Sequence, residues 1–308
     1  MYLEFFGMKE MPFSITPDTA FFMSRAGYQD ALNVLLVALR SGEGFVKVTG
    51  EVGTGKTLLC RTLLRRLGGE FATAYVPNPY LKPMALFYTI ADELGIDHAG
   101  ADEQHAFMKR LSEGLMALHE QGRRVVVCMD EVQAMPVETL ETLRLLTNLE
   151  TEKSKLIQVV LFGQPELDQV LENPSIRQLK QRITFSYQLL PLNRVALDQY
   201  LRHRLAVAGH EGRDLFHRAA RDLLHQASGG IPRLANILAN KALMAAFGRG
   251  DRQVRRLHMR MAIEDTADAR QWARPSTWRR TLRWIRGPLG VASLLLVAVV
   301  VGYGVHAG

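Results

Sequence analysis

The sequence predicts an α/β protein with a parallel-sheet core, followed by a helical lid domain and one C-terminal transmembrane helix. Three observations predict this organisation. A glycine-rich loop at residues 50–57 lies between an apolar strand and a helix. Two further apolar runs, at 124–129 and 156–162, are typical of parallel strands that are buried on both faces. From Pro191 onward the apolar residues recur at helical spacing.

The composition is that of a globular chain and excludes several other classes. Of the 308 residues, 47% are hydrophobic and 22% are charged, so the chain can bury a core. Cys60 and Cys128 are too few for a disulfide scaffold or a four-thiolate zinc site, and we interpret both as packing residues. The net charge of +7 includes six arginines after residue 269. Residues 1–269 hold 32 basic and 31 acidic side chains, a balance that requires no nucleic-acid-binding face.

The strongest motif is the loop at 50–57, which follows a strand at 45–49 and opens a helix at Leu58. Its glycines allow main-chain N–H groups to wrap phosphates, and the helix N-terminus adds positive potential. We expect Lys56 to reach the β- and γ-phosphates and the Thr57 hydroxyl to bind Mg²⁺. The loop matches the complete G-x-x-x-x-G-K-[ST] pattern with Gly50, Glu51, Val52, Gly53, Thr54, Gly55, Lys56 and Thr57.

Two acidic residues end the second strand. Asp130 and Glu131 follow the run at 124–129, where parallel α/β sheets place their chemistry. We expect Asp130 to hold Mg²⁺ through its water shell and Glu131 to orient and deprotonate the attacking water. An apolar strand that ends in two acids is a weak signal alone, but the phosphate loop upstream makes it a strong one.

Polar residues beyond the later strands are weaker candidates. Gln164 follows the strand at 156–162. We expect it to project beside Glu131 and to hydrogen-bond the γ-phosphate or the attacking water; the alternative is a plain strand-to-helix turn. Arg182 ends a helix before an alternating strand at 183–187, and it or Arg177 could reach the nucleotide of a neighbouring subunit. The alternative is that these arginines complement the dipole of a solvated helix end. Arg233 opens a lid helix and could contact the nucleotide, or it is an exposed arginine.

The C-terminal region predicts a membrane anchor. The apolar run at 289–305 would span about 26 Å as a helix, slightly less than a hydrocarbon core. We assign residues 1–190 to the α/β domain, 191–268 to the lid, 269–287 to a basic linker, 288–305 to the membrane helix and 306–308 to a short periplasmic tail.

The charges around this span set its expected orientation. Five arginines between 274 and 286 precede it and no basic residue follows, which keeps residues 1–287 in the cytoplasm. Trp272, Trp278 and Trp284 lie in the same approach and favour contact with lipid headgroups over a plain basic linker.

The ordered set of motifs resembles the AAA+ ATPases, in particular the branch of general secretion pathway protein A and the MSHA pilus biogenesis ATPase. The pilus ATPase is the closer form, because it shares a short C-terminal membrane segment. The resemblance covers about residues 1–268. It is carried by the loop at 50–57 with Leu58 to Arg61, and by the segments at 12–18, 74–79, 130–133, 145–150, 162–167, 177–183 and 228–234.

The resemblance implies ATP and Mg²⁺ as ligands, with Lys56 and Thr57 in Walker A and Asp130 and Glu131 in Walker B. It places Gln164 at sensor 1, and Gln is longer than the Asn, Ser or Thr that is common there. Arg182, or Arg177, takes the finger position. Leu58 joins the nucleotide-binding residues, and Arg233 takes the sensor-2 role.

The resemblance also implies a homo-oligomer, inner-membrane assembly proteins as partners, and a single-pass protein of the bacterial inner membrane. General secretion pathway protein A continues beyond its membrane segment into a periplasmic peptidoglycan-binding part, whereas here only residues 306–308 follow the expected span. We therefore expect any contact of this chain with the cell wall to be made by a partner.

Three functions follow as hypotheses. The first is an ATPase that supports assembly of a type IV pilus of the MSHA type or of a type II secretion apparatus. The second is a DNA-handling ATPase of the transposition or replication-initiation type, which the nearly neutral core and the membrane tail argue against. The third is a scaffold whose oligomeric state is set by ATP with little turnover.

Overall fold

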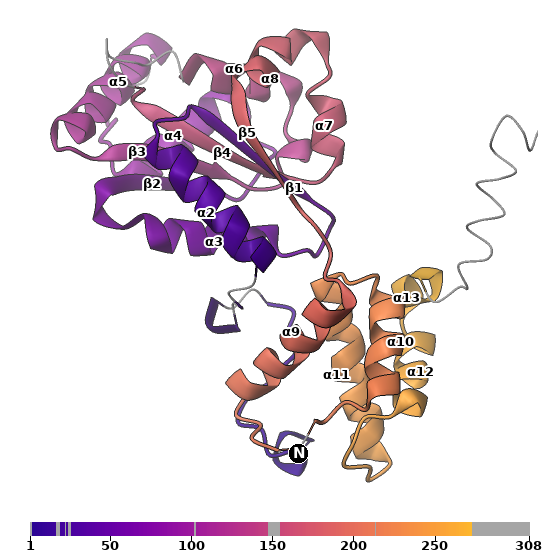
Figure 1. The fold of residues 1–308 in the computed structure, drawn as a ribbon. Coiled ribbons are helices and arrows are strands. Elements are labelled where there is room, and N and C mark those ends of the chain that lie inside the picture. The colour runs from indigo at the N-terminus through magenta and orange to yellow at the C-terminus, as the bar shows by residue number, and fades with distance from the viewer. Residues whose placement is uncertain are drawn as a thin grey trace, which may run out of the picture.

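The computed structural model describes residues 2–16, 19–21, 23, 26–101, 103–146, 155–212 and 214–272. These residues form an α/β unit and a smaller helical unit, which lie one above the other in Figure 1. The N-terminus lies beside the helical unit rather than beside the sheet.

The sheet has five parallel strands in the order β2-β3-β4-β1-β5. This arrangement confirms the predicted parallel α/β core. Because β1 lies beside β4 and β4 lies beside β3, their C-terminal ends are neighbours along one edge, about 4.8 Å apart per strand. The strands are β1 Phe45–Gly50, β2 Phe71–Val76, β3 Arg124–Met129, β4 Ile157–Gly163 and β5 Ile183–Leu189.

Helices cover both faces of the sheet. Successive side chains of a strand point to opposite faces, so Val125 and Val127 of β3 pack in one apolar cluster, and Val126 and Cys128 pack in the other. The first cluster includes α4, α5 and α6, and the second includes α2 and α3. Their bounds are α2 Ala26–Arg40, α3 Lys56–Leu67, α4 Pro83–Leu94, α5 Gln104–Glu120 and α6 Val137–Leu146, with the short α7 Glu166–Val170 and α8 Arg177–Arg182 after β4.

The helical unit has its own apolar core. Pro232 occupies the first turn of α11, where a missing N–H is tolerated, and the buried face of α11 runs through Leu234, Leu238 and Leu243. The helices are α9 Arg194–Val207, α10 Arg218–Ser228, α11 Pro232–Gly248, α12 Arg256–Glu264 and α13 Ala267–Trp272.

The N-terminal segment packs on the helical unit. After α1 (Tyr2–Phe5), the side chains of Phe6, Met8 and Phe13 are buried in the same cluster as the helices α9–α12. The ring of Phe13 meets Phe216 edge to face at 5.8 Å. We expected residues 1–190 to belong to the α/β domain. The N-terminal segment packs instead on the helical unit, because its apolar side chains cover the helical core and not the sheet.

The expected linker, membrane helix and tail at 269–287, 288–305 and 306–308 lie largely outside the described residues, which end at 272. Within the described part of the chain, no helix combines the length and the apolar character that a bilayer crossing requires.

Candidate nucleotide-binding and active site

The glycine-rich loop connects β1 to α3 with a backbone that requires glycine. Gly53 has φ 80° and Gly55 has φ 99°, both in the left-handed region. Gly55 directly precedes α3, so the first main-chain N–H groups of that helix, which have no acceptor within the helix, lie at the end of the loop. This backbone geometry is compatible with phosphate binding by the loop, which stays a prediction.

The same loop contacts the helical unit. The N–H of Arg233, in the first turn of α11, donates to the carbonyl oxygen of Gly53 at 3.1 Å. A Cβ on Gly53 would lie 2.6 Å from the Cβ of Arg233. Glycine is thus needed at 53 both for its φ angle and for this close approach of the two units.

Lys56 is a buried cation whose partners are carbonyl groups. It is 4% exposed, and its Nζ donates to the main-chain oxygens of Gly50 at 2.8 Å and Glu51 at 3.2 Å. Burial lowers the pKa of Lys56, and the negative charges of Glu131 and Asp130 oppose that shift. An ammonium group held by neutral carbonyls can exchange them for phosphate oxygens, so this site fits a polyphosphate.

Thr57 and Asp130 join the helix α3 to the end of β3. The Thr57 hydroxyl donates to the Asp130 Oδ2 at 2.6 Å, and Asp130 is 4% exposed. One hydroxyl and one carboxylate are hard oxygen ligands, which suit Mg²⁺ when substrate phosphates and water complete its coordination. These two residues would hold the Mg²⁺ ion, whose charge would neutralise phosphate oxygens.

Glu131 is held by two glutamine side chains. Its Oε2 accepts from Gln133 Nε2 at 2.6 Å and from Gln164 Nε2 at 2.9 Å. Burial raises the pKa of Glu131, but these two hydrogen bonds and the charge of Lys56 outweigh it, so the net pKa is lowered. Gln133 also accepts the main-chain N–H of Gln164 at 2.9 Å, which fixes the end of β4 against the end of β3.

The backbone at Glu131 is strained. Its φ is 52°, and among the residues that the structure describes it is the one non-glycine residue with a positive φ. Such a conformation costs about 1–3 kcal/mol and is found where a site must direct a side chain. Here it turns the chain into the short 3-10 helix Val132–Ala134 and brings Gln133 back toward the carboxylate.

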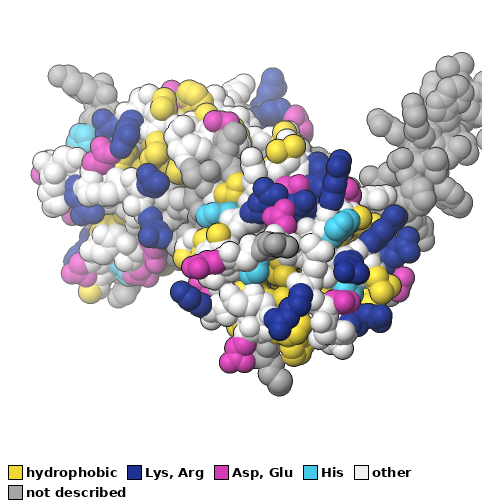
Figure 2. Space-filling model, turned by 60° about the horizontal axis from the view of Figure 1, so that its bottom comes forward, with side chains coloured by type: hydrophobic (Ala, Val, Ile, Leu, Met, Phe, Trp, Pro, Cys, Tyr) yellow, Lys and Arg dark blue, Asp and Glu magenta, His cyan; other side chains and the backbone are white. Residues whose placement is uncertain are grey.

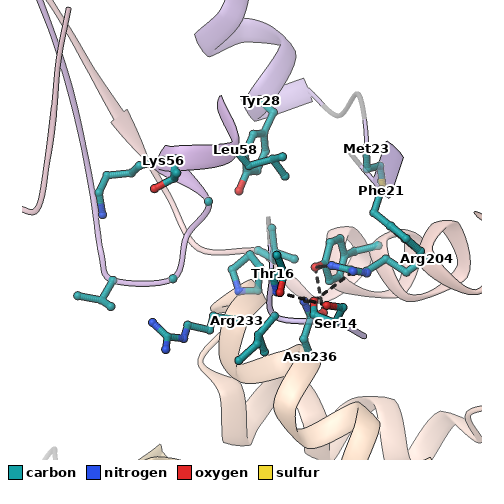
Figure 3. A pocket seen from close by; sticks show the side chains of 18 of the residues that line it. Ser14, Thr16, Phe21, Met23, Tyr28, Lys56, Leu58, Arg204, Arg233 and Asn236 are labelled. Atoms are coloured by element: carbon teal, nitrogen blue, oxygen red, sulfur yellow. Dashed lines mark hydrogen bonds between the residues drawn. The ribbon is translucent and has the colours of Figure 1, made fainter. Parts of the chain in front are cut away.

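A cavity of about 350 Å³ lies between the two units and includes the loop. Figure 3 shows Lys56 on one side of it and Ser14, Arg204 and Asn236 on the other. Glu131, Thr57 and Leu58 also line it, together with Ser14, Ile15, Thr16, Phe21, Met23, Tyr28, Val52, Gly53, Gly55, Leu192, Tyr200, Pro232 and Arg233.

The structure thus brings most of the expected site residues together. Asp130 and Gln164 do not line the cavity, but they bond to Thr57 and Glu131, which do. Gly50, Glu51 and Thr54 complete the loop behind that lining.

The two finger candidates lie elsewhere. Arg182, at the end of α8, donates through Nη1 to the carbonyl oxygen of Arg144 at 3.3 Å, and Arg177 is exposed at the start of the same helix. Neither lines the cavity of its own chain. Their assignment as a finger stays a prediction.

Sequence reasoning gave no role to several residues around the cavity. No sequence pattern indicated a role for Tyr28. Gln133 was indicated only by its place in the segment 130–133, which carries the resemblance. The Tyr28 hydroxyl donates to the main-chain oxygen of Thr54 and so supports the loop from α2. Arg204 and Asn236 lie in helices whose periodicity predicted core packing only.

The five-stranded parallel sheet, the phosphate-type loop and the attached helical unit define a P-loop fold of the AAA type. In agreement, residues 39–171 match a family model described as an AAA domain. The chain is 42% identical to general secretion pathway protein A of Aeromonas hydrophila over 298 residues, which are 97% of this chain and 53% of the relative. The chain therefore spans about half the length of the curated relative it matches.

Solved structures share the fold at low sequence identity. Cdc6p of Pyrobaculum aerophilum aligns with a TM-score of 0.62 and 20% identity, over 80% of this chain and 70% of that one. ORC2 of Aeropyrum pernix aligns at 0.59 and 19%, over 81% and 72%. The Holliday junction branch migration motor RuvB of Thermotoga maritima aligns at 0.52 and 17%, over 88% and 80%. At these identities the likeness establishes the fold alone.

Proposed function

We propose that this chain binds and hydrolyses Mg²⁺-bound ATP in the cavity between the α/β and helical units. The observation that carries the proposal is the grouping of a buried cation, a hydroxyl–carboxylate pair and a carboxylate held by amides at one sheet edge. Separate strands and loops supply these groups, and each suits a different part of a phosphoryl transfer site.

In this proposal, separate residues bind the phosphates, hold the metal ion and accept the proton. Lys56 and the loop N–H groups bind the β- and γ-phosphates, and Thr57 and Asp130 hold Mg²⁺. Glu131 accepts a proton from the attacking water, and its lowered pKa keeps it ionised at neutral pH. Gln164 bonds to that carboxylate and can orient the water or the γ-phosphate from the end of β4.

We further propose a setting at the bacterial inner membrane, with the ATPase unit in the cytoplasm. Support comes from the 42% identity to general secretion pathway protein A and from the apolar run at 289–305 with its preceding arginines. In this setting the chain assembles with copies of itself, Arg182 or Arg177 reaches the neighbouring nucleotide, and the assembly supports construction of a secretion apparatus or of an MSHA-type pilus.

Hydrolysis is tested with Lys56→Ala in the purified full-length chain. We expect wild-type protein to release phosphate from Mg·ATP, and the variant to lose both nucleotide binding and turnover. Lys109→Ala is the matched control, because that side chain is 71% exposed on α5 and pairs loosely with Glu113 at 3.9 Å. Wild-type protein that binds no adenine nucleotide would refute the proposal.

The setting is tested by co-purification from solubilised membranes. We expect inner-membrane assembly proteins to follow the wild-type chain and to be lost or altered with Lys56→Ala. Recovery of secretion components or of pilus components distinguishes the two systems. A full-length chain that stays in the soluble fraction would contradict the membrane setting.

The DNA-handling alternative has a separate test. On the helical face shown in Figure 2, basic and acidic side chains are interspersed. Three arginines of α9 and α10 form ion pairs within the helical unit, Arg194 with Asp222, Arg202 with Asp214 and Arg221 with Asp214. Paired arginines offer little charge to a phosphate backbone. Salt-dependent binding of duplex DNA at physiological ionic strength would favour the alternative.

A further inference from the structure

Helix α9 carries a buried arginine with an unusual set of partners. Arg204 is 6% exposed, and within the described residues no carboxylate forms an ion pair with it. Its Nε donates to the main-chain oxygen of Pro12, its Nη2 to that of Ser14 at 3.3 Å, and its Nη1 to the Tyr200 hydroxyl at 2.9 Å. The guanidinium also lies over the ring of Phe21, 4.6 Å from its centre.

A side chain that only filled the core of the helical unit would be apolar. Burying a guanidinium is unfavourable unless its donors are satisfied and its charge is compensated. Here two peptide carbonyls, one hydroxyl and an aromatic face provide that compensation. Two of these partners belong to residues 12–16, which we call the N-terminal strap. The arrangement therefore attaches the strap to α9.

A second helix attaches the same strap. Asn236 of α11 donates through Nδ2 to the Ser14 carbonyl oxygen at 3.4 Å, so that oxygen accepts from two helices. The Tyr200 hydroxyl donates to Asn236 Oδ1 at 2.9 Å, which links the two attachments. Arg204, Tyr200, Asn236 and the strap form one connected network, in which the removal of one member weakens the others.

This network lies at the end of the cavity opposite the phosphate-binding lysine. Figure 3 shows Ser14, Thr16, Arg204 and Asn236 grouped together, with Lys56 across the cavity. Apolar residues that line the cavity together with the strap include Ile15, Phe21 and Met23. A nucleotide whose phosphates lie at Lys56 has its base at this end, where a flat apolar ring with polar edges fits.

We propose that Arg204 is a positioning residue for the nucleoside base: it holds the N-terminal strap so that residues 14–16 form the wall against which the base binds. This inference rests on the proposed nucleotide site and specifies how its base end is built. Because Arg204 holds the strap that contacts the base, we expect the affinity for ATP to depend on Arg204. Because Arg204 does not contact the phosphate-binding loop, the affinity for a triphosphate without a base should not depend on it.

The test compares Mg·ATP with inorganic tripolyphosphate, both measured by calorimetry on the full-length chain. We expect Arg204→Met to weaken ATP at least tenfold and to leave tripolyphosphate within twofold of wild type. The KM for ATP should rise while kcat stays near its wild-type value. Arg204→Lys should recover part of the affinity, because an ammonium group can reach one of the two carbonyls.

Arg202→Met is the matched control, since Arg202 lies on the same helix but its side chain is 62% exposed and pairs with Asp214. Its affinities for both ligands should equal those of wild type. If Arg204→Met does not fold, Tyr200→Phe tests the same network, because it keeps the ring and removes only the hydroxyl. We expect about threefold weaker ATP binding there, again with unchanged tripolyphosphate.

Two results would overturn the proposal alone: ATP affinity unchanged in both variants, or an equal loss of both ligands, which indicates a general structural role. Wild-type protein that binds neither ligand overturns the nucleotide site itself and the proposal with it.

Discussion

Replacing Glu131 by glutamine separates hydrolysis from binding in this site. The carboxylate accepts hydrogen bonds from Gln133 and Gln164 at 2.6 and 2.9 Å, and a glutamine keeps the size and one acceptor oxygen for these donors. It loses the ability to take a proton. General-base catalysis contributes about 10²–10⁴-fold, so kcat should fall at least about a hundredfold, which adds about 2.7 kcal/mol to the barrier.

The assay has two readouts on the same protein. Phosphate release at saturating Mg·ATP gives kcat, and calorimetry gives the dissociation constant, which should stay within about threefold of wild type because Lys56, Thr57 and the loop are unchanged. Glu113→Gln on α5 is the control, with a side chain that is 65% exposed. A Glu131→Gln variant that hydrolyses ATP within threefold of the wild-type rate would remove Glu131 from the role of general base.

Two further predictions concern the neighbours of this carboxylate and of the loop. In Gln133→Ala, Glu131 loses a hydrogen bond that lowers its pKa, so the acid limb of kcat should move to higher pH relative to wild type; coincident pH profiles would contradict this. In Gly53→Ala, alanine must adopt a φ of 80°, and its Cβ would lie 2.6 Å from the Cβ of Arg233. We expect this to destabilise the fold by about 1–2 kcal/mol and to weaken ATP binding. The Tm should therefore be lower than that of wild type and should rise less on adding ATP; an unchanged Tm would refute the prediction.

The residues that sequence alone could place are those whose chemistry depends on local backbone geometry. Glycines at 53 and 55 are required by positive φ angles, and that requirement is visible as a spacing in the sequence. Asp130 and Glu131 were predictable because an apolar run predicts a buried strand, and parallel strands end on one edge. Because β3 and β1 both flank β4, Asp130 then lies close enough to accept from Thr57 of the loop.

The remaining contacts depend on tertiary packing that leaves no periodic signal. Gln133 reaches Glu131 only because the backbone at 131 adopts φ 52°, which residue type does not predict. The N-terminal strap is irregular, and its aromatic neighbours show no helical or strand spacing, so its attachment to the helical unit was missed. Arg204 was unpredictable for a related reason, because a charged residue on a helix is usually exposed.

The helical unit borders the cavity through two contacts, one made by Arg204 and one by Arg233, and these contacts have different roles. At one end Arg204 holds the strap, and at the other the N–H of Arg233 bonds to Gly53 in the loop. A ligand group that makes equal contacts before and after hydrolysis shifts no equilibrium between conformations. The base and its wall are equal in ATP and ADP, so Arg204 can set affinity but cannot distinguish the two nucleotides. On the proposed function, a change in the helical unit on hydrolysis must therefore begin where the phosphates bind. The hydrogen bond from Arg233 to Gly53 connects the loop to that unit.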